Sequence, residues 1–147
     1  MAQSKEATKK FIQEQVSASD MSGESVRWFE MSFTGDTMIY RVGSYSRKRG
    51  ETKEGSRRKA QVVTGALKDL NPDRVEVDKS RPNASPFFSG IELFTTEGRR
   101  TIKVITESEK KTGLWICTKD NRTAERVGRA LIHLIKLCGG KGDLFGK

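Results

Sequence analysis

The segment 121–140, NRTAERVGRALIHLIKLCGG, constrains the fold of this 147-residue chain more than any other stretch. Its apolar residues recur at helical spacing, which at about 100° per residue places them on one stripe of a helix. Asp120 or Asn121 can cap the start of this helix, and Gly139 can end it in a left-handed conformation. The sequence therefore predicts an amphipathic helix that covers a core. The stripe consists of Ala124, Val127, Leu131, Leu134, Ile135 and Cys138.

Upstream of this helix, apolar and polar residues alternate in short stretches that are typical of antiparallel strands. Residues 27–34 and 37–45 are joined by Gly35-Asp36 and read as a hairpin. Pro82 and Pro86 exclude a central strand, so 79–86 is expected to be a loop. We therefore predict a mainly β fold, a barrel or sandwich of about seven strands, six of them in meander-like order, capped by the C-terminal helix. The other expected strands are 60–67, 74–78, 87–96, 99–106 and 114–118.

The N-terminal part differs from the rest. Residues 4–18 predict a short helix whose weak apolar side carries Phe11, Ile12 and Val16. The stretch SASDMSGES that follows is rich in small polar residues and reads as a linker. This divides the chain into an N-terminal helix and linker (1–24), a domain (25–140) and a short tail (141–147).

Seven short antiparallel strands followed by one helix resemble a pleckstrin-homology-like (PH-like) barrel. Three stretches carry a closer similarity to a group of bacterial PH-like proteins: LKDLNPDRVEV, ELFTTEGRRTIKV and DNRTAERVGRALIHLIKLCGGK. The resemblance implies two sheets packed nearly orthogonally with the helix over one open end. It implies no particular ligand, because this barrel hosts lipid, peptide and protein binding. Lipid-binding members place basic residues around the first hairpin loop, whereas here that loop is TGDT, so no ligand residues are carried over.

The net charge of +9 and a pI near 9.8 indicate attraction to polyanions such as nucleic acid, anionic lipid or acidic proteins. Cys117 and Cys138 make no disulfide framework, and both read as small buried hydrophobes. No apolar run has the length of a membrane span, and the first residues lack the apolar core of a signal peptide. A cytoplasmic location is the expectation.

The first candidate binding surface is the basic stretch 46–59. It could clamp phosphates, since arginine binds them in a bidentate manner. Equally, it could be a solvated loop whose charge keeps a sheet edge from pairing with neighbours. No aromatic residue interleaves it, so stacking of bases is not supported there. Its basic residues are Arg47, Lys48, Arg49, Lys53, Arg57, Arg58 and Lys59.

The second candidate is the outer face of the last helix, opposite the apolar stripe. A basic ridge there could rest on a nucleic-acid backbone or an anionic surface, or it could be the ordinary polar face of a surface helix. The helical wheel turns His133 toward water. The ridge consists of Arg122, Arg126, Arg129, His133 and Lys136.

Constellations that support catalysis are missing from the sequence. His133 has no nucleophile one turn away, and one histidine with two separated cysteines gives no metal-ligand spacing. The glycines of CGGKG follow a helix, whereas a phosphate-binding loop precedes one. We therefore expect no enzyme, no cofactor and no metal.

Trp28 and Trp115 alternate with the inward-facing residues of their strands, which places both on outer faces. There they could anchor an interface, or the N-terminal helix could cover one of them. The function that we expect is a binding or scaffold module that contacts an acidic protein or another polyanion through a basic surface. The alternative is weak, sequence-independent nucleic-acid binding through 46–59 and the last helix. The sequence leaves the oligomeric state open.

Overall fold

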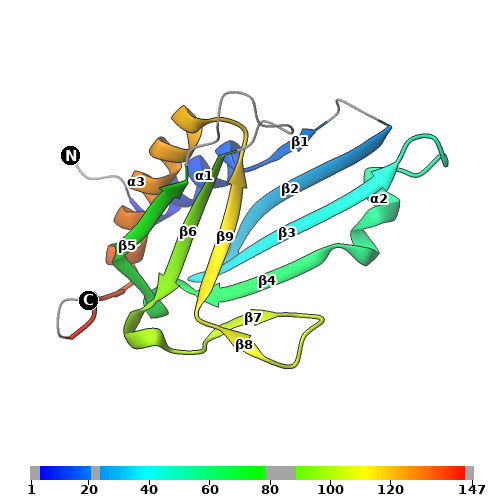
Figure 1. The fold of residues 1–147 in the computed structure, drawn as a ribbon. Coiled ribbons are helices and arrows are strands. Elements are labelled where there is room, and N and C mark those ends of the chain that lie inside the picture. The colour runs from blue at the N-terminus through cyan, green and yellow to red at the C-terminus, as the bar shows by residue number, and fades with distance from the viewer. Residues whose placement is uncertain (1–3, 21–23, 79–88, 145–147) are drawn as a thin grey trace.

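The computed structural model describes residues 4–20, 24–78 and 89–144, and these form two antiparallel sheets with two long helices, α1 and α3, lying side by side (Figure 1). The mainly β fold with a C-terminal helix is thus confirmed. The two sheets do not close into a barrel. Buried side chains from both sheets and both helices, among them Phe29, Met38, Ile91 and Leu131, form a common hydrophobic core.

The larger sheet is built around the predicted hairpin at Gly35-Asp36, in which Gly35 adopts the positive φ of 58° that the turn requires. Its strand order is β1-β2-β3-β4-β7-β8, and every neighbouring pair is antiparallel. The strands are β1 (Ala18–Asp20), β2 (Ser25–Thr34), β3 (Thr37–Ser46), β4 (Gln61–Ala66), β7 (Ile102–Val104) and β8 (Lys110–Lys111).

The smaller sheet has the order β5-β6-β9, so the strands after β4 do not continue a simple meander as predicted. A 3₁₀ helix (Leu67–Asp69) turns the chain away from the larger sheet, and its first residue Leu67 and the following Leu70 are fully buried. Of the stretch KDLNPD (68–73), which the sequence predicts to be a turn, only Lys68 and Asp69 belong to this turn, and the strand begins at Leu70 instead of at residue 74. The strands of this sheet are β5 (Leu70–Asp78), β6 (Ser89–Thr95) and β9 (Gly113–Thr118).

The helix α3 (Asn121–Leu137) forms as the sequence predicts. Asp120 caps it by accepting a hydrogen bond of 2.7 Å from the Thr123 amide, and this bond lowers the pKa of the Asp120 carboxyl. Gly139, with a φ of 90°, follows the helix end. The predicted stripe is fully buried except for Cys138, which is only half-buried because it lies at the cap of the helix.

The helix α1 (Lys5–Gln15) packs against α3 and β2 and is part of the same core. Ile12 and Val16 are fully buried, so the weak apolar side predicted for this segment is its packing face. The segment after it is not simply a linker as predicted, because β1 pairs with β2 and places Ser19 opposite Trp28. Hydrogen bonding to an existing edge strand orders these small polar residues.

Some of the predictions fall on residues that the structure does not describe. The loop predicted for 79–86 and the start of the fifth expected strand at Phe87 lie outside the described residues, as does the end of the tail beyond residue 144. Among the residues that are described, no helix is both long enough and apolar enough to cross a bilayer.

Candidate functional site

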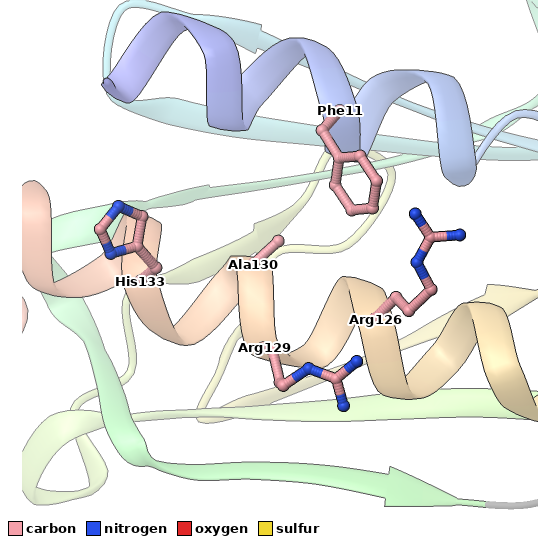
Figure 2. Close-up of a pocket in the computed structure, with 5 residues that line it drawn as sticks. All are labelled: Phe11, Arg126, Arg129, Ala130 and His133. Carbon is pink, nitrogen blue, oxygen red and sulfur yellow. The ribbon is translucent and has the colours of Figure 1, made fainter. Parts of the chain in front are cut away.

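A groove runs between α1 and α3 and holds a hollow of about 410 Å³, within the size range of about 300–1,000 Å³ that is common for ligand sites (Figure 2). Phe11 comes from α1, and all the other lining residues come from α3. Figure 2 shows Phe11, Ala130 and Arg126 turned toward the space between the helices. The lining residues are Phe11, Arg126, Arg129, Ala130 and His133.

The groove combines an aromatic wall with a basic one. The Arg126 guanidinium lies 5.3 Å from the centroid of the Phe11 ring, within the range of a cation–π contact. Arg129 leaves α3 on the side turned away from α1 in Figure 2, so its charge lies at the rim of the groove. Arg126 and Arg129 are both exposed, and their positions one turn apart give the groove two neighbouring cations.

His133 lies at one end of the groove and is half-buried. The prediction that it points to water holds only in part, because the side chain lines the hollow between α3 and α1. Ala130 and Phe11 line the groove without belonging to either predicted basic set, and Phe11 is the one that comes from another helix. The only signal for it was the weak apolar side of the N-terminal helix, from which the partner helix could not be inferred.

A set of ion pairs ties α1 to the tip of the β2–β3 hairpin and so fixes the wall of the groove. The Lys9 ammonium, on an almost fully buried side chain, donates 2.7 Å to the Gly35 carbonyl and 3.2 Å to Asp36. Burial alone would lower the pKa of Lys9, but hydrogen bonds to Glu6 and Asp36 outweigh it and raise the pKa. Lys5 adds a second pair to Asp36 at 3.2 Å, and these two lysines lower the pKa of Asp36. The acidic hairpin turn thus serves to hold α1.

The basic stretch 46–59 is ordered and includes a short helix, α2 (Lys53–Ser56), which continues into a 3₁₀ helix (Arg57–Lys59). The solvated loop considered for this stretch is therefore wrong for residues 53–59. Thr52 caps α2 by accepting a hydrogen bond of 3.1 Å from the Gly55 amide. The helix covers the outer face of the hairpin, where Trp28 is completely buried beneath it.

Arg57 makes several contacts within this cover, and its side chain is partly exposed. Its guanidinium pairs with both carboxylate oxygens of Glu30, with Nη2 to Oε2 at 3.2 Å, and with Glu54 at 3.1 Å. The Arg57 guanidinium and the Lys53 ammonium each lie 5.3 Å from the centroid of the Trp28 ring. The hydrogen bond from Arg57 lowers the pKa of the Glu30 carboxyl against the opposing effect of burial.

The remaining predicted basic residues do not gather at one hollow. Lys59 lines a second cavity of about 300 Å³ beside α2, whose other lining residues are neutral or, in the case of Glu51, acidic. Arg122 lies one turn before Arg126 on α3 and does not line the groove. The exposed members of the set are Arg47, Lys48, Arg49, Arg58, Lys59 and Arg122. Of the nine residues predicted as contacts, the structure brings Arg126 and Arg129 into the groove.

The described residues contain no group of three or more histidine, cysteine, aspartate or glutamate side chains arranged to hold a metal ion. Burial raises the pKa of both thiols, at Cys117 and at Cys138, so each is held as the neutral form. The chemistry that the groove offers is recognition of negative charge by arginine next to an aromatic ring.

Comparison of the sequence with family models finds no match, and the comparisons with curated proteins and with solved structures find none either.

Proposed function

We propose that this protein is a non-enzymatic, PH-like binding or scaffold module that contacts an acidic protein or another polyanion through the groove between α1 and α3. The observation that carries the proposal is a hollow lined by Arg126, with Arg129 at its rim and the Phe11 ring as its opposite wall. Two packed antiparallel sheets with a C-terminal amphipathic helix support a PH-like relationship. The crossing from β4 to β7 within the larger sheet is a difference from the expected strand order.

An acidic protein segment suits this groove better than a bare polyanion. Arginine binds carboxylates in a bidentate geometry, and the Phe11 ring gives apolar area that a peptide side chain can cover. A nucleic-acid backbone would gain from the arginines alone, because the groove presents one aromatic ring and no series of rings for successive bases. The acidic protein is therefore the leading partner, and sequence-independent nucleic-acid binding is the alternative.

Binding of a labelled polyglutamate peptide, measured by fluorescence anisotropy, tests the proposal. We expect Arg126→Glu/Arg129→Glu to weaken binding by about tenfold or more, because each reversal replaces attraction with repulsion. Arg47→Glu/Arg49→Glu is the matched control, since it changes the net charge equally on exposed residues away from the groove. Equal losses in both variants would show that only the overall charge matters and would reject the groove.

The same measurement with a labelled oligothymidylate separates the two partner classes. Binding to nucleic acid should weaken steeply with salt, with a log–log slope of roughly −0.7 for each phosphate contacted in a single strand. Tighter binding of the oligonucleotide than of the peptide, lost in the Arg47/Arg49 variant, would favour the nucleic-acid alternative.

A further inference from the structure

In the part of the chain that the structure describes, the edge of β9 differs from the other sheet edges, because the strand itself carries none of the features that protect an edge against pairing with another chain. Natural sheets protect their edges with short strands, charged residues, proline or a covering element. In the larger sheet, β1 has three residues and β8 consists of two exposed lysines. In the smaller sheet, β5 carries Pro72 and several charged residues and packs against α3. The sequence of β9, GLWICT, contains neither a charge nor a proline.

The backbone of β9 shows which groups lie along this edge. The smaller sheet ends at β9, which pairs with β6 on one side only. The Cys117 amide leaves β9 on the other side and donates 2.9 Å to the hydroxyl of Tyr40. The Thr112 carbonyl points the opposite way, since it accepts from the Thr95 amide of the β6 strand. Because backbone direction alternates along a strand, the amides of Gly113 and Trp115 share the direction of the Cys117 amide.

A cleft lies along this edge, between β9 and the inner face of the larger sheet. Its volume is about 240 Å³, which exceeds the roughly 150 Å³ of an apolar cavity that holds benzene, so one large side chain fits. In Figure 1, β2 and β3 extend past β9. The floor of the cleft comes from β2, β3 and β4. The floor residues are Phe29, Tyr40, Val42 and Val63.

The side chains around the cleft indicate what would fill it. Trp115 lines it and is 42% exposed, an unusual exposure for the residue type most enriched in binding hot spots. Arg27 and Gln61 line the cleft from β2 and β4, and both are exposed. Arg27 is the charged residue among the lining side chains, so the cleft favours a ligand with a carboxylate beside an apolar group.

We propose that the β9 edge is a second binding site, at which a short extended peptide adds as a strand next to Gly113 and Trp115. An alternate side chain of the peptide, apolar and large, enters the cleft over Val42 and Val63, and an acidic residue of the peptide meets Arg27. Main-chain hydrogen bonds supply affinity, and the cleft supplies specificity, as in other cases of strand addition. The Tyr40 hydroxyl already occupies the Cys117 amide and thus limits the added strand to the first half of β9. This site is formed by residues other than those of the groove.

The test begins with selection of displayed random dodecapeptides on the immobilised full chain, followed by synthesis of the best binder. An analogue methylated at alternate backbone nitrogens keeps every side chain but loses the hydrogen bonds of an added strand. We expect it to bind about tenfold more weakly, which corresponds to one or two net hydrogen bonds. We also expect the bound peptide to slow hydrogen exchange at the amides of Gly113 and Trp115, measured by NMR on isotope-labelled protein.

Variants give an independent readout. Trp115→Ala should weaken the peptide by about tenfold, whereas Ile105→Ala, which removes a comparably exposed apolar residue outside the cleft, should not. Arg126→Glu/Arg129→Glu should leave this binding unchanged, which separates the result from that for the groove. Failure to select any peptide, equal affinity of the methylated analogue, or unchanged exchange at both amides would each overturn the proposal.

Discussion

Trp28 and Trp115 occupy similar positions on two different sheets, yet one is completely buried and the other is 42% exposed. Each lies on an outer face with its ring over a glycine of a neighbouring strand. A Cβ atom at Gly43 would lie 2.4 Å from the Trp28 ring, and one at Gly90 would lie 2.1 Å from the Trp115 ring. The two strand environments are therefore alike, and what differs is the layer above the ring.

The cover over Trp28 is short and polar, which shows that burial of an aromatic ring does not need an apolar partner element. Ser56 accepts a hydrogen bond of 2.8 Å from the Trp28 indole and in turn donates to the Lys53 carbonyl at 2.7 Å. Cations at 5.3 Å from the ring centroid complete the contact. None of the helices that the structure describes covers Trp115, and its ring is partly exposed.

Replacing each tryptophan with alanine should give the largest difference in stability between the two regions. Trp28→Ala should lower the free energy of unfolding by about 3–5 kcal/mol, as for other buried aromatic residues. Trp115→Ala should lower it by about 1 kcal/mol or less, because much of that ring is already in water. Denaturant titrations with unchanged slopes measure both values. Equal losses would mean that the cover contributes little to stability.

Replacing the glycine beneath each tryptophan ring with alanine should give a smaller difference in stability, again with the larger loss in the Trp28 region. In Gly43→Ala the new methyl group meets a ring fixed by Ser56, which should cost about 1–3 kcal/mol. In Gly90→Ala the Trp115 ring can swing into solvent, so the loss of stability should be smaller and the tryptophan emission should shift to the red. Thermal unfolding together with fluorescence spectra distinguishes the two responses. A larger loss at Gly90 would contradict the assignment of Trp115 as the movable ring.

Of the two tryptophan regions, acid should act on that of Trp28, which contains the Glu30–Arg57 pair. Since Arg57 lowers the pKa of Glu30 from its ordinary value of 4.5, the Glu30–Arg57 pair stabilises the fold fully above that pH, and its contribution is lost as the pH falls through the lowered pKa. The loss should be about 1 kcal/mol or less, because the pair is partly exposed. Fluorescence of Trp28 in a Trp115→Phe background, followed from about pH 5 to about pH 3, measures it. Glu30→Gln should remove this part of the acid response.

The elements that the sequence predicted well are those whose partner is unambiguous. Helix α3 has a continuous apolar stripe, and its cap at Asp120 and its end at Gly139 lie where the side chains require them. The β2–β3 hairpin follows from the turn residues Gly35 and Asp36. In both cases local chemistry and burial agree, so no long-range information is needed.

The predictions that were wrong concern segments whose structure depends on contacts with distant parts of the chain. Nothing local to β4 indicates that it pairs with β7 and not with the strand that follows it. The high charge of the basic stretch 46–59 suggests a solvated loop. The contact that orders it joins Arg57 to Glu30, which is 27 residues away, and nothing in the stretch itself indicates that contact. Arg126, Arg129 and His133 belong to the ridge predicted for the last helix, but Phe11 joins them only because α1 packs on α3.

The ion pairs that fasten α1 have a consequence for how the protein can be divided. A fragment cut at residue 25, where the sequence suggests that the domain begins, would lack Ile12 and Val16 from the core. It would also expose part of the apolar stripe of α3 and remove the aromatic side of the groove. The first helix is thus an integral part of the folding unit, and a faithful minimal version of this protein must retain it together with Asp36, its anchor on the hairpin.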